Sequence, residues 1–401
     1  MSIYSVSGAE LSALYDVRGT SLTQAYDVSG NELISGDYDR WDTEYQHTIL
    51  QARDAWAAEY RADDTIIPVI IHTDQHRYLN AAHKPTFDYL ARAVKWDEVS
   101  AIIGLGDVCG AVYNTTDLNN MLTCLSSLPR AKRIDVAGNH DAQLDKAEGS
   151  SYAYAPMTNE LFHTLQDTYF NNSQFGGNNS NVRYGYKGME TVIDPLHHIR
   201  FCIFAVWETG SAPDYYGNPW YAYRLTPAAA EAMIAMLSAV DDLDIVVLSH
   251  IQPYHEEVIY HKPAVDGGEA YATTEFSKPG HLGYSVSLDR LYADRKAKRA
   301  GVLVDVEGNE HPYDFSRCTS DLLCSLSGHS HTDYFLYSPD GTMPAVVFDA
   351  YRYDNRPLFF VNIDRTKQRL NVWKFDEANQ IYNYQVPFLE SGMESGEGVG
   401  A

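Results

Sequence analysis

Five short polar clusters hold the histidine, carboxylate and amide side chains that could carry out chemistry in this chain. Each cluster follows directly after a run of apolar residues that is long enough to form a β-strand. The clusters lie at residues 73–76, 106–107, 137–141, 249–250 and 327–331. A mixture of carboxylate, imidazole and amide ligands suits Zn, Mn or Fe, whereas calcium would take oxygen ligands only. These residue types therefore indicate a metal site built from distant segments.

The polar clusters can meet if the apolar runs before them form one α/β core. Apolar runs alternate with helical patterns at 85–95, 117–128 and 227–240, which predicts an α/β fold. The predicted strands are 66–71, 101–105, 133–137, 201–206, 245–248 and 322–326, followed by an antiparallel set at 334–337, 345–349, 358–363 and 369–375. In an α/β sheet, residues beyond the carboxyl ends of neighbouring strands converge on one crevice.

The order of these motifs, D-x-H, G-D, G-N-H-D, H and G-H-x-H, resembles that of the calcineurin-like metallophosphoesterase superfamily. Five motifs in this order, each closing a strand, are far more specific than any single one. The resemblance covers residues 66–375, which is most of the chain. It implies a four-layer α/β/β/α sandwich of two mixed β-sheets, with a dinuclear metal site at the strand ends.

The resemblance also implies a role for each side chain at the strand ends. Asp107 would bridge two metal ions, because neighbouring cations repel each other and need a shared anionic ligand. The first ion would be held by Asp74, His76 and His331, and the second by Asn139, His250 and His329. The ions would be divalent or of mixed valence, with Mn, Zn and Fe as the candidates.

The expected reaction is hydrolysis of a phosphomonoester or phosphodiester by a metal-bound hydroxide, whose pKa the ions bring towards ~7. His140 would protonate the leaving oxygen, and Asp141 would orient its imidazole. Arg77 could bind a substrate phosphate with two hydrogen bonds, although a surface salt bridge is equally open. Tyr254 and His255 could line a substrate pocket or lie in an ordinary loop.

One position departs from the pattern of many relatives. Gly110 stands where they carry Asp or, in the purple acid phosphatases, Tyr. We therefore expect no tyrosinate-bound iron. The arginine that follows the second motif in protein Ser/Thr phosphatases is also absent, which argues against that branch.

Composition excludes several classes of function. Among 401 residues, 30 Lys and Arg stand against 54 Asp and Glu, a net charge of −24 that disfavours long nucleic acids and anionic membranes as partners. No apolar run approaches the ~20 residues that span a bilayer. The N-terminus lacks the pattern of a secretory signal, and five cysteines without a C-x-x-C pair predict reduced thiols. We expect a cytoplasmic protein.

The N-terminal segment repeats the pattern Tyr-x-Val-x-Gly-x-x-Leu three times at a period of 11, starting at Tyr4, Tyr15 and Tyr26. Each copy predicts half of a small β-hairpin that packs on the main domain or on other subunits, and a mobile leader is the alternative. The repeats lead us to expect a homo-oligomer. We divide the chain into a repeat segment (1–40), a connecting helix (41–62), a metallophosphoesterase domain (63–390) and a frayed tail (391–401).

The repeats also keep a second kind of function open. They resemble leaders of phage-tail and surface proteins of gut bacteria. The alternative to an enzyme is a structural or adhesive protein that retains the phosphoesterase fold without catalysis, and a phage origin and an association with a surface stay open for it. Every expected ligand position and His140 are filled in this chain, which favours the enzyme.

Overall fold

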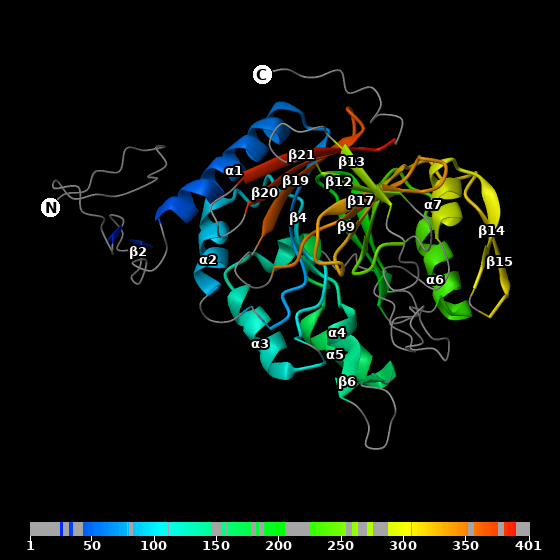
Figure 1. Cartoon of the computed structure of the whole chain (residues 1–401), viewed down its shortest axis with the longest axis horizontal. Helices are drawn as coiled ribbons and strands as arrows, with labels where there is room; N and C mark the ends of the chain where they lie inside the picture. The colour runs from blue at the N-terminus through cyan, green and yellow to red at the C-terminus, as the bar shows by residue number, and fades with distance from the viewer. Residues whose placement is uncertain are drawn as a thin grey trace.

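The computed structural model describes strands β1 (Ala25–Tyr26) and β2 (Glu32–Ile34) and most of residues 43–389 (Figure 1). Within 43–389, the residues left undescribed are 78, 80–82, 111, 146–153, 158, 178–181, 184–187, 205–224, 254–258, 264–270, 276–287, 306, 352–356 and 376–380. The first two repeat copies, Tyr254, His255 and the tail at 391–401 therefore lie outside the described residues.

A six-stranded mixed sheet contributes three of the strand ends that precede polar clusters. Its order is β21-β20-β19-β3-β4-β5. The strands are β3 (Ile66–His72), β4 (Ala101–Gly104), β5 (Arg133–Asp135), β19 (Leu358–Asp364), β20 (Arg369–Phe375) and β21 (Ile381–Pro387). Strands β3, β4 and β5 are parallel, so the loops that follow them begin at the same edge of the sheet.

A nine-stranded mixed sheet contributes the other two strand ends. Its order is β13-β12-β17-β18-β16-β11-β10-β9-β8, in which β10, β11, β16 and β18 are parallel. The strands are β8 (Val182–Arg183), β9 (Met189–Asp194), β10 (Ile199–Phe204), β11 (Asp244–Ser249), β12 (Ile259–Pro263), β13 (Tyr271–Glu275), β16 (Leu322–Ser327), β17 (Tyr334–Tyr337) and β18 (Pro344–Val347). The predicted α/β class is thus confirmed, and the predicted strands agree with the structure to within two residues at most ends.

Helices cover the sheets. Figure 1 shows α1 and α2 on one side of the two sheets and α6 and α7 on the other. The helices are α1 (Thr43–Ala62), α2 (Lys84–Ala93), α3 (Thr115–Cys124), α4 (Asn139–Ala142), α5 (Asn159–Tyr169), α6 (Pro227–Leu237) and α7 (Asp289–Lys296), with 3₁₀ turns η2 (Arg130–Lys132) and η3 (Phe175–Gly177). Two small ribbons complete the described elements: β6 (Gln143–Asp145) with β7 (Tyr154–Pro156), and β14 (Ala300–Val304) with β15 (Glu310–Asp314). Among the described helices, none is long and apolar enough to cross a membrane.

The third repeat copy contains both strands of a hairpin. Ala25–Tyr26 pairs antiparallel with Glu32–Ile34. The prediction that each copy forms only half of a hairpin is therefore wrong for this copy. The sequence of this copy carries Gly30 and Asn31, residue types that favour turns, between its two ends, and this signal favours pairing within one copy.

Helix α1 packs on the six-stranded sheet through Trp56. The indole ring is fully buried, stacks on Phe360 of β19 at 4.9 Å between ring centroids, and donates a hydrogen bond from Nε1 to the carbonyl of Val361 over 3.1 Å. Tyr60, one turn later, packs edge-on against the same indole. The helix predicted as a connector is therefore packed directly on the sheet that carries β3.

Replacing Trp56 by Ala should lower the free energy of unfolding by about 3–5 kcal/mol, because it leaves a large cavity between helix and sheet. Trp56→Phe is the matched control: it keeps a ring on Phe360 and should cost less. Urea unfolding followed by circular dichroism measures both. A loss below about 1 kcal/mol in the Ala variant would contradict the packing of α1 described above.

Candidate metal centre

Hydrogen bonds from backbone N–H groups tie the loops after the parallel strands to one another. The N–H of His76, after β3, donates to the carbonyl of Asp107, after β4, over 2.8 Å. The N–H of His329, which follows β16 in the other sheet, donates to Oδ2 of Asp74 over 2.8 Å. The side chains of the polar clusters are thus presented from a frame that joins both sheets.

Candidate ligands dominate the residues with an unusual backbone conformation. Nine non-glycine residues of the described chain have a positive φ, which the clash between Cβ and the backbone disfavours. Five of the nine are Asp74 (53°), His76 (42°), Asp107 (54°), His329 (71°) and His331 (55°). Strained backbone that clusters in this way is typical of functional sites, where the surrounding structure holds it in place.

Three side chains form a first group of potential ligands. Nε2 of His76 and Nε2 of His331 lie 2.7 Å apart. Oδ1 of Asp74 lies 3.2 Å from Nε2 of His331 and 3.7 Å from Nε2 of His76. The structure thus gathers the three residues that the family resemblance places around the first ion, and their ligand atoms could hold a metal.

A second group forms around Asp107. Its Oδ2 lies 3.1 Å from Nε2 of His250, and these two residues with His329 could hold a metal. Nδ1 of His329 lies 3.2 Å from Oδ1 of Asn139, the amide expected at the second ion. The ring of His250 is oriented by a hydrogen bond between its Nδ1 and the carbonyl of Leu105 over 2.6 Å, which leaves Nε2 facing Asp107.

Each of the two buried carboxylates has one oxygen fixed by hydrogen bonds and one left over. Oδ2 of Asp74 accepts from Oγ1 of Thr73 and the N–H of His329, and Oδ1 of Asp107 accepts from the N–H of His140. Oδ1 of Asp74 and Oδ2 of Asp107 are buried without a hydrogen-bond partner. A buried carboxylate oxygen without a partner is costly, so this arrangement fits a cation as the missing partner.

Asp305, a buried carboxylate beside a half-buried histidine, shows the contrast. Asp305 lies beside His311, with 2.8 Å between Oδ2 and Nε2. Its two oxygens also accept from the N–H groups of Glu307 and Asn309 and from the Asn309 side chain. The Asp305 carboxylate is therefore satisfied by the protein alone, unlike those of Asp74 and Asp107.

The electrostatics of the site favour positive charge. Burial alone would lower the pKa of His250, but the carboxylates of Asp107 and Asp74 raise it to about 9. Burial alone would raise the pKa of Asp74, but the facing His250 and His331 hold it well below its usual range. The two buried carboxylates therefore need positive charge beside them, which either a protonated His250 or a bound metal ion would supply.

His140 stands beside the second group. Its Nε2 lies 3.8 Å from Oδ2 of Asp107, and its ring packs edge-on against His76 at 4.7 Å between centroids. The side chain is 26% exposed, and burial lowers its pKa. A partly exposed imidazole at this place could either transfer a proton or contribute a further ligand, since His76, Asp107 and His140 also form a potential metal-binding group.

Asp141 does not orient the imidazole of His140, contrary to the prediction. Its Oδ1 accepts from the N–H groups of Val108 and Cys109 over 3.0 and 2.9 Å, and its Oδ2 accepts from the N–H of Gly138 over 2.8 Å. The prediction was wrong because backbone donors of two neighbouring loops occupy the carboxylate. Burial and the nearby charge of Asp107 raise the pKa of Asp141, against the lowering effect of these donors.

Of the three residues predicted to bind the substrate, the structure describes only Arg77. Arg77 is exposed and directly follows the candidate ligand His76. None of the described residues forms an ion pair with it, so the predicted alternative of a surface salt bridge is not seen in the described part. Tyr254 and His255 lie outside the described residues.

Two residues that support the ligands were missed from the sequence. Thr73 holds Oδ2 of Asp74 over 2.7 Å, and the carbonyl of Leu105 orients His250. Thr73 could have been found from its place beside Asp74 in the first polar cluster. Leu105 acts through its backbone, which no side-chain pattern marks.

Gly138→Ala should empty the centre of metal while the chain stays folded. A Cβ at this position would overlap both Oδ1 and the backbone N of Asp107, so the loop after β4 must move. We expect at least a 100-fold weaker metal affinity, beyond the 10- to 100-fold that outer-shell changes cost. Metal analysis after dialysis checks this. Gly308→Ala, at a position with open space around it but a positive φ of 83°, is the control for backbone strain alone, and it should keep its metal.

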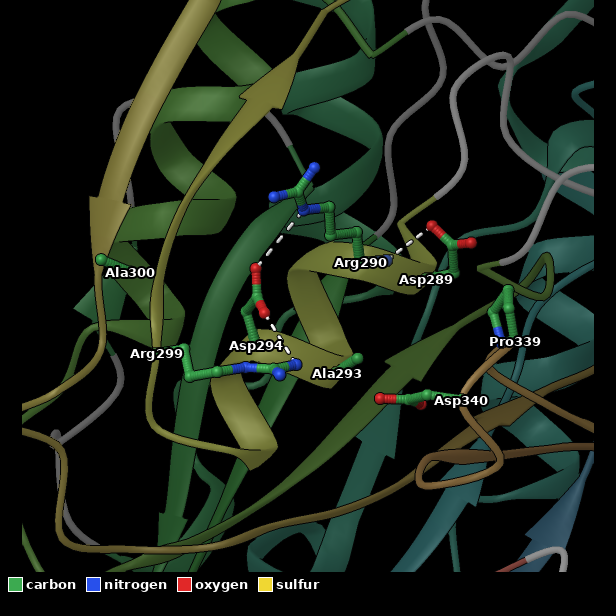
Figure 2. A pocket seen from close by; sticks show the side chains of 8 residues that line it. All are labelled: Asp289, Arg290, Ala293, Asp294, Arg299, Ala300, Pro339 and Asp340. Atoms are coloured by element: carbon green, nitrogen blue, oxygen red, sulfur yellow. Dashed lines mark hydrogen bonds and ion pairs between the residues drawn. The ribbon is translucent and has the colours of Figure 1, made fainter.

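A surface cavity of about 400 Å³ lies elsewhere, at the start of α7. Figure 2 shows its lining, in which Asp294 points between the guanidinium groups of Arg290 and Arg299. Asp340 lies on the opposite wall. No candidate ligand lines this cavity, so it is separate from the centre at the strand ends.

No protein-family model matches the chain, and no curated protein matches it either.

Proposed function

We propose that this chain is a metal-dependent phosphoesterase of the calcineurin-like superfamily, with the four-layer sandwich that the resemblance implies. One observation carries the proposal. Oδ1 of Asp74 and Oδ2 of Asp107, both buried and without hydrogen bonds, lie among imidazole nitrogens that arrive from both sheets. This is the donor set that a pair of Zn, Mn or Fe ions would require.

Each candidate residue has its own proposed role in binding metal or transferring a proton. Asp74, His76 and His331 would hold one ion, and Asn139, His250 and His329 the other, with Asp107 between them. Such ions supply Lewis acidity towards a phosphoryl oxygen and towards water. Within the protein, His140 would donate a proton from its ring to the leaving oxygen as the ester bond breaks.

The backbone frame gives this arrangement its catalytic value. The hydrogen bonds that join the loops hold each ligand before substrate arrives. A site that is already organised avoids the cost of arranging polar groups during the reaction. The buried floor, in which Asp74 and His250 have no exposed surface, also keeps bulk water away from the charges.

Metal loading followed by activity measurement tests the proposal. The protein is stripped with a chelator, reloaded with Mn, Zn or Fe, and assayed on p-nitrophenyl phosphate and bis(p-nitrophenyl) phosphate. We expect two metal ions per chain and turnover that depends on them. A chain that takes up no metal and hydrolyses neither ester would overturn the proposal and favour the structural or adhesive alternative.

A further inference from the structure

The accessible side of the candidate metal centre is defined by exposure. Asp74, Asp107 and His250 form a floor whose side chains are at most 1% exposed. His140 and His331 form the rim, with 26% and 24% of their side chains exposed. A substrate must approach over this rim, because the floor is closed.

Arg77 directly follows the candidate ligand His76 in the loop after β3. Its residue is exposed, and no ion pair holds its guanidinium among the described residues. Its backbone is fixed: φ is 65°, and its N–H donates to the carbonyl of Val108 over 2.7 Å. Within the described part of the chain the guanidinium therefore has no ionic partner, and its backbone is fixed one residue from a candidate ligand.

Gly110 gives the stem of Arg77 its place. A Cβ on Gly110 would lie 3.0 Å from Cδ and 3.4 Å from Cγ of Arg77, so the aliphatic stem rests directly on this glycine. Two hydrogen bonds fix the loop that carries Gly110. The carboxylate of Asp141 accepts from the N–H of Cys109, and the carboxylate of Asp117 accepts from the N–H of Gly110. A methyl group at 110 would require the stem to shift by a few tenths of an ångström.

We propose that Arg77, resting on Gly110, binds the non-reacting oxygens of the phosphate and makes phosphomonoesters the preferred substrates. This inference rests on the proposed phosphoesterase function and names its substrate class. A phosphomonoester carries about −1.5 to −2 charges at pH 7, whereas a diester carries only one. A guanidinium binds two phosphate oxygens at once through its planar fork, and a diester has one oxygen fewer to offer.

The experiment compares the metal-loaded wild type with Arg77→Ala, Arg77→Lys and Gly110→Ala. It measures kcat/KM on p-nitrophenyl phosphate and on its bis-ester, and the affinity for inorganic phosphate by calorimetry. Arg77→Ala should lower kcat/KM for the monoester and phosphate affinity by about 10- to 100-fold, the contribution of hydrogen bonds to a charged group. The diester should change by less than about 3-fold, within surface effects. Arg290→Ala, an exposed arginine of the cavity in Figure 2, is the matched control and should change neither value.

Two smaller substitutions separate the effect of the two-point hydrogen bonding of the guanidinium from the effect of its positive charge. Arg77→Lys should recover part of the lost phosphate affinity, because it keeps the charge but loses the fork. Gly110→Ala should shift the preference towards the diester while it leaves metal content unchanged. Equal losses on both esters, or an unchanged phosphate affinity in Arg77→Ala, would overturn the inference. A wild type that binds phosphate but hydrolyses neither ester would overturn the proposed function, and the phosphate affinities would still decide the role of Arg77.

Discussion

Asp107→Asn should abolish turnover and reduce the metal content of the protein from two ions to at most one. The substitution keeps the shape of the side chain but removes the negative charge that two neighbouring cations need between them. Outer-shell changes already cost 10- to 100-fold in metal affinity, so the loss of this ligand should exceed about 100-fold. Metal analysis after dialysis, together with hydrolysis of p-nitrophenyl phosphate, measures both effects.

The matched control for this substitution is Asp305→Asn. Asp305 is also a buried carboxylate beside a histidine, but its oxygens are hydrogen-bonded within the protein. It should keep two metal ions and full turnover. If Asp107→Asn retained both ions, Asp107 would not bridge them. If Asp305→Asn lost them as well, metal loss would reflect general destabilisation of the fold.

Much of the centre could be predicted from the sequence because local patterns determine it. Strands such as β3 and β16 are buried along their whole length, so they read as continuous apolar runs. The polar residue after each run then lies at the end of a parallel strand, where the topology brings such ends together. Motif order was therefore sufficient to place Asp74, Asp107 and His250 at one site.

Other features could not be predicted because distant groups determine them. Helix α7 is strongly polar and has no apolar stripe, yet Arg295 on it is fully buried. It is stabilised there by donating to the carbonyls of Leu237 and Ser320. Strand β9 escaped prediction for a similar reason, since Glu190, its second residue, is buried and accepts a hydrogen bond from Asn172. The sequence shows which polar side chains are present, but it does not show which distant hydrogen-bond partners the fold places beside them.

The role of Asp141 was missed for the same reason, and the correction changes how the site is understood. A carboxylate beside a histidine in G-N-H-D suggests a pair, but its partners are three backbone N–H groups. Asp141 thus joins the loop after β4 to the loop after β5. It supports Asp107 and, through residues 108–110, the base on which Arg77 rests.

His140→Ala should lower kcat by about 10²- to 10⁴-fold, the range of general acid catalysis, and should leave two metal ions bound. The imidazole lies at the exposed rim, 3.8 Å from Oδ2 of Asp107, at a place where a leaving oxygen could be protonated. Among the described residues no carboxylate accepts a hydrogen bond from this ring, since Asp141 is bound to the backbone. Its backbone is instead tied to Asp107 through its own N–H, which the substitution retains. Metal analysis and steady-state kinetics measure the two effects separately.

The dependence on the leaving group decides between a proton donor and a further ligand. If His140 protonates the leaving oxygen, His140→Ala should reduce hydrolysis of phenyl phosphate more than that of p-nitrophenyl phosphate, whose leaving group needs less protonation. His163→Ala, an exposed histidine on α5, is the control that should change neither rate. Equal losses on both esters with fewer ions bound would instead make His140 a ligand, together with His76 and Asp107. The rim would then hold a metal where we place a proton donor, and the leaving group would have to depart without help from this side chain.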